Sequence, residues 1–167
     1  MTWAESLVRY FKEANISLLA YIADINIGEI AKLMQQDPFF HVVSASREEE
    51  AIGIAAGAYA VGQNACVFMQ SSGFGNCVNA LAGLCIPYRI PIPMVINLRG
   101  QPGEHTIAQV GMGRATRPIM DVLGLPHFTL ENQENLEQQA NQNQKKANQK
   151  NQPLQHKSLI MVMRLVI

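Results

Sequence analysis

Apolar residues occur along the first 130 positions in two alternating patterns. Residues 3–14 place Trp3, Leu7 and Phe11 at the three- and four-residue spacing of an amphipathic helix. The nearly unbroken apolar run over residues 16–22 that follows is typical of a buried strand. The chain therefore begins with a predicted helix and a predicted strand.

The same pair of patterns repeats along the chain. Further helices are expected over residues 27–35, 48–61, 76–84 and 117–123, and further strands over residues 39–44, 65–70, 93–98, 127–130 and 159–166. Alternating short strands and helices imply right-handed crossovers and a parallel sheet covered on both faces. We therefore predict an α/β fold, a three-layer α/β/α domain over residues 1–167 with a mostly parallel sheet of about six strands.

Residues 131–157 differ from the rest in composition, because fourteen of these twenty-seven residues are Asn or Gln. Such a polar tract forms either a disordered linker or a solvent-exposed helix. Leu136, Ala140 and Ala147 allow a weakly amphipathic helix, and the apolar run after the tract must return to the sheet. We therefore favour a polar helix over residues 131–157.

The charge and the length of the apolar runs exclude several classes of function. Of 167 residues, 48% are hydrophobic, and Lys+Arg 13 balance Asp+Glu 13, so the net charge is +0. A neutral chain lacks the basic surface that binds nucleic acid or an anionic membrane. The apolar runs are shorter than the ~20 residues that span a bilayer, and the first residues resemble no export signal. We expect a cytoplasmic protein.

The three cysteines, Cys66, Cys77 and Cys85, show neither CxxC spacing nor a His at ligand spacing. They are interpreted as buried, inert thiols, because an unpaired Cys packs as a small hydrophobic residue. No metal site is predicted in this chain.

In parallel sheets, ligands bind beyond the carboxyl ends of the strands, so the strand-to-helix turns are candidate sites. The first turn leads into Glu48, Glu49 and Glu50. Three carboxylates suit the first turn of a helix, with Ser46 as the N-cap and Glu49 closing a capping box. Further along, Gly53, Gly57 and Ala60 leave one helix face without side chains, and we expect another subunit to approach it closely.

The second and third turns carry polar residues. Residues 70–76 contain glycines but match neither G-x-G-x-x-G nor a Walker sequence, and the first strand also lacks the glycine fingerprint of a dinucleotide-binding oxidoreductase. In the third turn, Arg99 and His105 are placed to meet an anionic substrate. The structural alternatives are a surface ion pair for Arg99 and a solvated loop position for His105.

Five motifs, taken in order, resemble one family. They are Glu48 with Gly53 and Gly57, Gln70-Ser71-Ser72-Gly73-Phe74-Gly75-Asn76, Asn79-Ala80-Leu81, Pro91-Ile92-Pro93-Met94-Val95, and Arg99-Gly100-Gln101-Pro102-Gly103-Glu104. Residues 3–130 resemble the pyrimidine-binding domain of thiamine-diphosphate-dependent 2-oxo-acid decarboxylases. The likeness is greatest to the α subunit of sulfopyruvate decarboxylase and the N-terminal part of phosphonopyruvate decarboxylase.

The resemblance assigns the central role to Glu48, which precedes the first glycine by five positions and the second by nine. In that family a glutamate hydrogen-bonds the aminopyrimidine of the cofactor and promotes its imino tautomer, which deprotonates the thiazolium carbon. This chemistry needs a carboxyl group with a raised pKa in a desolvated pocket. Glu49 and Glu50 are neighbouring candidates. The resemblance also implies that the cofactor and the substrate are bordered by Gln70, Ser71, Ser72, Gly73, Phe74 and Asn76, with Phe74 packed on the ring.

The family anchors the diphosphate through Mg²⁺, which a Gly-Asp-Gly start and a later Asn hold, and no Gly-Asp-Gly occurs here. The resemblance therefore implies half an active site, completed by a diphosphate-binding β-type subunit that holds Mg²⁺ in a hetero-oligomer. The expected substrate is a short anionic 2-oxo acid such as 3-sulfopyruvate or 3-phosphonopyruvate. A carboligating enzyme subunit and a non-catalytic interaction subunit of the same fold are the alternatives.

Overall fold

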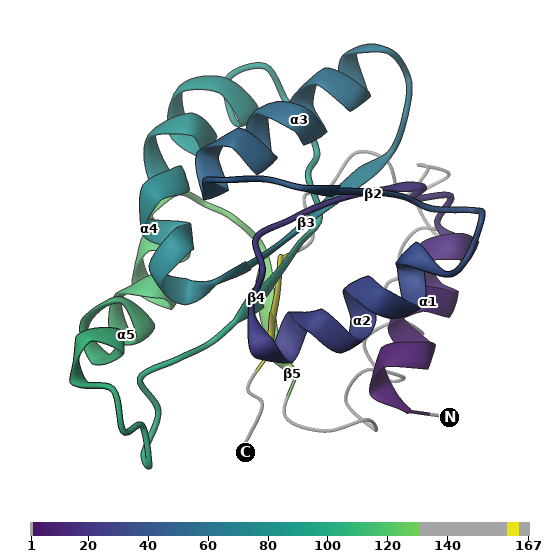
Figure 1. The fold of residues 1–167 in the computed structure, drawn as a ribbon. Coiled ribbons are helices and arrows are strands. Elements are labelled where there is room, and N and C mark those ends of the chain that lie inside the picture. The colour runs from purple at the N-terminus through teal and green to yellow at the C-terminus, as the bar shows by residue number, and fades with distance from the viewer. Residues whose placement is uncertain (1, 131–159, 164–167) are drawn as a thin grey trace, which may run out of the picture.

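The computed structural model describes residues 2–130 and 160–163, in which helices and strands alternate (Figure 1). The helices are α1 (Trp3–Glu13), α2 (Ile25–Gln35), α3 (Glu48–Ala60), α4 (Ser71–Ala80) with a π-helical extension η1 (Leu81–Cys85), and α5 (Ile107–Val122). The strands are β1 (Leu18–Tyr21), β2 (His41–Ser44), β3 (Ala65–Gln70), β4 (Met94–Asn97), β5 (His127–Leu130) and β6 (Ile160–Met163).

The strands form one sheet in the order β2-β1-β3-β4-β6-β5, and every neighbouring pair is parallel. The predicted α/β class with a parallel sheet is confirmed. The order reverses direction at β1, because β2 lies on one side of it and β3 on the other. The carboxyl ends of β1 and β3 therefore border the crevice where ligands bind in sheets of this kind.

Helices cover both faces of the sheet (Figure 1). Side chains such as Leu19 and Phe68 point to one face, where they pack against α1 and α2. Ala20 and Val67, their sequence neighbours, point to the other face, where they join a core with α3, α4 and α5. This alternation follows from the two-residue period of a strand, and it explains why the central strands read as continuous apolar runs.

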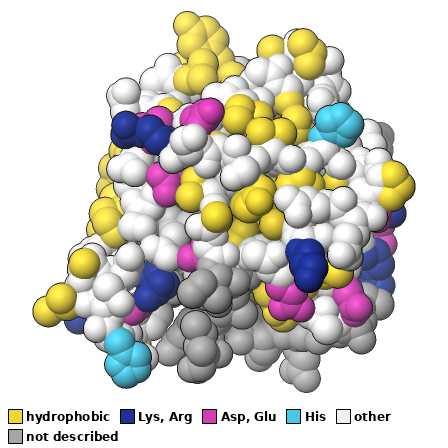
Figure 2. All heavy atoms as spheres, viewed as in Figure 1, with side chains coloured by type: hydrophobic (Ala, Val, Ile, Leu, Met, Phe, Trp, Pro, Cys, Tyr) yellow, Lys and Arg dark blue, Asp and Glu magenta, His cyan; other side chains and the backbone are white. Residues whose placement is uncertain are grey.

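The strand β2 forms one edge of the sheet and is less buried than the central strands. Hydrophobic side chains gather over the middle of the face that contains β2 (Figure 2). Val42 and Val43 of this strand are half-buried.

The three thiols, Cys66, Cys77 and Cys85, are buried and unpaired, which confirms the prediction.

Two helices differ from the predictions. Residues 71–76 form the first turns of α4 and not the predicted glycine turn. The helix begins at Ser71, directly after β3 ends at Gln70. The helix expected over residues 117–123 is the second half of α5, which begins at Ile107 and contains Pro118. Gly111 and Gly113, residues that disfavour a helix, lie in the half that was not predicted. The helix predicted over residues 131–157 lies outside the described residues.

No helix in the described part of the chain is both long enough and apolar enough to span a membrane.

Candidate functional site

The strand-to-helix turns meet at the carboxyl edge of the sheet. Asp24 follows β1, and α3 begins at Glu48 shortly after β2. Gln70 ends β3 and pairs in register with Asn97, which ends β4. Four turns that are far apart in the sequence therefore bring polar side chains to one edge, as parallel strands require.

Glu48 is half-buried and lies between α3 and the beginning of α4. Its Oε2 accepts a hydrogen bond from Nδ2 of Asn76, at 3.1 Å. Gly73 lies against the other side of the carboxyl group, since a Cβ at this position would overlap Cγ, Cδ and Oε1 of Glu48. A side chain at position 73 would therefore displace the Glu48 carboxyl group from this place.

The other two glutamates of the turn each make one local polar contact. Oε1 of Glu49 forms an ion pair with Arg47 at 2.7 Å, while its Oε2 is buried without a hydrogen-bond partner among the described residues. Oε2 of Glu50 accepts a hydrogen bond from the backbone N–H of Ser46 at 2.7 Å. The predicted capping box of Ser46 and Glu49 is therefore wrong. Arg47 is the N-cap residue, and the side chain of Glu50, rather than that of Glu49, accepts the hydrogen bond from the backbone before the helix.

Cys77 lies one helical turn beyond Gly73, close enough to Glu48 and Glu49 for their negative charges to affect its thiol. Burial, and then the negative charges of Glu48 and Glu49, raise the pKa of the Cys77 thiol to about 12. The thiol is therefore neutral near pH 7 and carries no charge into the site.

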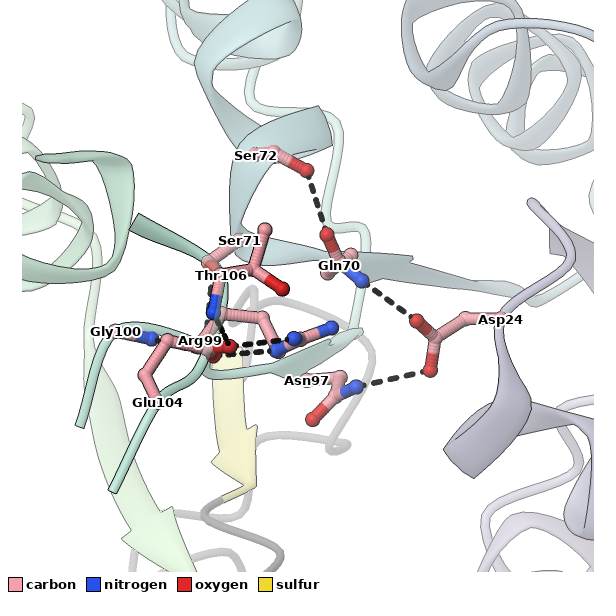
Figure 3. A network of polar contacts seen from close by, with 9 residues as sticks. All are labelled: Asp24, Gln70, Ser71, Ser72, Asn97, Arg99, Gly100, Glu104 and Thr106. Carbon is pink, nitrogen blue, oxygen red and sulfur yellow. Dashed lines mark hydrogen bonds and ion pairs between the residues drawn. The ribbon is translucent and has the colours of Figure 1, made fainter. Parts of the chain in front are cut away.

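A second group of polar side chains surrounds Asp24 (Figure 3). Its carboxylate accepts hydrogen bonds from Nε2 of Gln70 at 2.7 Å and from Nδ2 of Asn97 at 2.9 Å. Oε1 of Gln70 in turn accepts a hydrogen bond from Oγ of Ser72 at 2.8 Å. Asp24 thus joins the ends of β1, β3 and β4 across the crevice at the switch point of the sheet.

The third turn is organised by Glu104, whose side chain is 10% exposed (Figure 3). Arg99 donates to it through Nε and Nη2, both at 2.8 Å, and the backbone N–H groups of Gly100 and Thr106 donate at 3.2 Å and 3.0 Å. These bonds hold the pKa of Glu104 down to about 2, with the Arg99 hydrogen bond as the largest cause. The backbone N–H of Arg99 also donates to Oγ of Ser71, at 3.1 Å.

The remaining residues of the predicted site differ in exposure. Phe74 is fully buried in the core between the sheet and α4, and its packing on the ring of the cofactor stays a prediction. Ser71 is also fully buried, whereas His105 is exposed. The interpretation of Arg99 as an ion-pair partner agrees with its contact to Glu104.

Sequence reasoning missed Asp24 and Asn97 as members of the site. Both stand at the carboxyl end of a predicted strand, and this position was the available signal. A lone Asp or Asn in such a place is common, however, and only the folded arrangement shows that they bind one another. Among residues 2–130 and 160–163, no three His, Cys, Asp or Glu side chains group closely enough to hold a metal ion.

The edge presents a carboxyl group beside a surface without a side chain, the combination that the sequence resemblance assigns to an aminopyrimidine. Glu48 supplies a carboxyl group with an oxygen that no described side chain or backbone group binds, and Gly73 supplies a surface without a side chain beside it. Gln70 and Ser72 add amide and hydroxyl groups at the neighbouring strand end. The residues present therefore fit the pyrimidine half of the cofactor that the sequence motifs imply.

Comparisons with known proteins show the family of the chain. Residues 1–125 match the family described as thiamine pyrophosphate enzyme, N-terminal TPP binding domain. The chain belongs to this family.

The individual relatives that the chain matches are named as decarboxylases. The chain is 40% identical over 126 residues to sulfopyruvate decarboxylase subunit alpha of Methanothermobacter thermautotrophicus, an alignment that covers 75% of this chain and 76% of the relative. It is 32% identical over 123 residues to phosphonopyruvate decarboxylase of Streptomyces viridochromogenes, which covers 73% of this chain and 31% of the relative.

A solved structure shows the same fold. The thiamine-diphosphate-dependent 4-hydroxybenzoylformate decarboxylase of Rhodococcus jostii RHA1 superposes with a TM-score of 0.71 at 18% identity, over 98% of this chain and 30% of that chain.

Proposed function

We propose that this chain is the pyrimidine-binding α subunit of a thiamine-diphosphate-dependent 2-oxo-acid decarboxylase. The observation that carries the proposal is Glu48, a half-buried carboxylate against Gly73 at the carboxyl edge of the sheet. The family membership and the named decarboxylases among the relatives support it.

Glu48 is the acid–base residue of this proposal. When bound, thiamine diphosphate supplies the electron sink that decarboxylation of a 2-oxo acid needs. Glu48 holds or releases one proton at its carboxyl group, at the edge where the pyrimidine binds. Gln70 and Ser72, which bind each other, border the cofactor.

The substrate is a short anionic 2-oxo acid, such as 3-sulfopyruvate or 3-phosphonopyruvate. The names of the relatives support this class of substrate. Arg99 lies at the same edge, and within the described residues its Nη1 has no hydrogen-bond partner after Nε and Nη2 have bound Glu104. Arg99, together with the exposed His105, is the candidate to meet the anionic group.

The diphosphate and Mg²⁺ are held by a partner, a β-type subunit. The designation of a relative as subunit alpha supports a two-subunit enzyme. The isolated chain then binds the cofactor weakly. Isothermal titration with thiamine diphosphate and Mg²⁺ tests this, and a dissociation constant below about 1 μM for the chain alone would contradict the divided site.

The function is tested by Glu48→Gln in the complex with the partner subunit. Decarboxylation of 3-sulfopyruvate falls at least ~100-fold, because an amide cannot exchange a proton as a positioned carboxyl group does. In Glu49→Gln and Glu50→Gln the rate of decarboxylation falls less than about tenfold. These side chains bind Arg47 and the backbone at the beginning of α3. Equal losses at all three positions would reduce Glu48 to a structural member of an acidic turn.

A further inference from the structure

We propose that Asn76 is a positioning residue that holds the Glu48 carboxylate through Oε2 and so leaves Oε1 to carry the proton. The inference rests on the proposed function of Glu48. It assigns Asn76 to the glutamate and not to direct contact with the cofactor.

The contact itself sets which oxygen is used. At 3.1 Å from Oε2, the Asn76 amide donates through Nδ2, because a carboxylate oxygen can only accept. A donated N–H favours the ionised form of the oxygen that receives it. The proton of a carboxyl group held in this way therefore resides on the other oxygen, Oε1, which has no hydrogen-bond partner among the described residues.

The two residues that contact the Glu48 carboxyl group, Gly73 and Asn76, both belong to α4. Gly73 and Asn76 are three residues apart, so they lie on one face of α4. Gly73 admits the carboxyl group because it has no side chain, and Asn76 fixes its rotation through the hydrogen bond. One helix face thus sets both the position and the orientation of Glu48.

Charged neighbours of Glu48 do not duplicate this role. Arg47, the cation nearest in sequence, is bound to Glu49. Cys77 on α4 is neutral, and Glu50 is bound to the backbone of Ser46. Within the described residues, Asn76 is the one side chain that donates a hydrogen bond to Glu48.

Two substitutions separate positioning from cofactor contact. Asn76→Asp keeps the shape of the side chain, removes the N–H donor and adds a carboxylate beside Glu48, whereas Asn76→Ala removes the whole amide without adding a charge. Gln36→Glu is the control, because it adds the same charge at an exposed position after α2, on the opposite face of the sheet.

The first readout needs neither cofactor nor partner. Carbon-13 NMR of the glutamate carboxyl groups in the full chain, with Glu48→Gln to assign the signal, follows the protonation of Glu48 against pH. In Asn76→Asp the midpoint moves to higher pH by about one unit, because a neighbouring carboxylate disfavours the charged form. In Asn76→Ala it moves in the same direction by less, and in Gln36→Glu it does not move.

The second readout is kinetic, in the complex with the partner subunit. Asn76→Ala lowers kcat about tenfold, a fraction of the full contribution of an acid–base group, and leaves the affinity for thiamine diphosphate within about threefold. An unmoved NMR midpoint in both Asn76 variants, or a large loss of cofactor affinity with unchanged kcat, would overturn the inference. Full activity in Glu48→Gln would instead overturn the proposed function, so the two failures are distinguishable.

Discussion

Two glutamates at the carboxyl edge of the sheet, Glu48 and Glu104, have contrasting surroundings. Glu104 accepts four hydrogen bonds, two from Arg99 and two from backbone N–H groups of its own loop. Glu48 accepts one, from Asn76, and lies against a glycine. Both carboxylates come from turns that face the same edge, so the difference lies in how many donors each turn provides.

The difference separates a structural carboxylate from one that is available for chemistry. Four donors hold the pKa of Glu104 at about 2, so this group stays ionised near pH 7 and does not act as an acid–base residue there. Glu48 retains an oxygen that no described group binds. An acid–base residue needs such an oxygen, because a carboxylate with every lone pair occupied has no place for a proton.

The largest predicted effect concerns the glycine beside Glu48. Gly73→Ala introduces a methyl group that overlaps the Glu48 side chain and displaces its carboxyl group. We expect decarboxylation in the complex to fall at least ~100-fold, the scale of a lost acid–base residue. Steady-state kinetics measure the loss. In a Glu48→Gln background the same change adds little, and a large additional loss there would show that Gly73 acts through another residue.

The next effect concerns Asp24, which binds two amide donors. Asp24→Asn leaves one carbonyl oxygen for two N–H donors and turns its own amide toward Gln70 or Asn97. We expect the free energy of unfolding to fall by ~1–3 kcal/mol, the cost of a buried donor without an acceptor. Urea denaturation measures this change. Glu29→Gln, at an exposed position of α2, is the control and changes stability by less than about 0.5 kcal/mol. Equal stability of Asp24→Asn and the parent chain would contradict the account.

The ion pair of Glu104 predicts a pH dependence. Its folded-state pKa, about 2, lies below the ordinary value of 4.5, so the stabilisation is present above pH 4.5 and is lost as the pH falls toward 2. Urea midpoints measured between pH 5 and pH 2 should fall in the parent chain. The fall should be smaller in Glu104→Gln, which cannot ionise, and equal slopes in both proteins would contradict the role of this pair.

The smallest effect uses a glycine that has no close neighbour. Gly28 lies in α2, and a Cβ there would meet nothing within 4 Å. Gly28→Ala should therefore raise the free energy of unfolding by ~0.4–1 kcal/mol, through the lower entropy of the unfolded chain. Thermal denaturation compares it with Gly73→Ala. Stabilisation by both alanines would show that position 73 does not need a glycine.

Much of the fold follows from the hydrophobic pattern. The central strands are continuous apolar runs, and the predicted bounds of β3 and β5 agree with the structure. The pattern failed at the first turns of α4, where Gly73 and Gly75 suggest a turn, and at the first half of α5, which contains Gly111 and Gly113. Tertiary contacts determine that these segments are helical. One example is the packing of Gly75 against Met112 of α5.

The candidate site was predictable in part. The spacing of Glu48, Gly53 and Gly57, together with the family resemblance, selected Glu48 as the candidate. The contacts that distinguish it from Glu49 and Glu50 depend on side-chain directions at a helix end, which spacing does not determine. The pairing of Asp24 with Asn97 joins residues 73 positions apart and requires the strand order of the sheet.

The most direct test of the account is the exchange of the C2 proton of thiamine diphosphate in the complex with the partner subunit and without substrate. This exchange depends on the proton held at Glu48 and not on binding of the oxo acid. The account predicts that Glu48→Gln slows deuterium incorporation at C2 by at least ~100-fold, while Glu49→Gln and Glu50→Gln leave it within about tenfold of the parent complex. Unchanged exchange in Glu48→Gln would contradict the assignment of Glu48 as the acid–base residue.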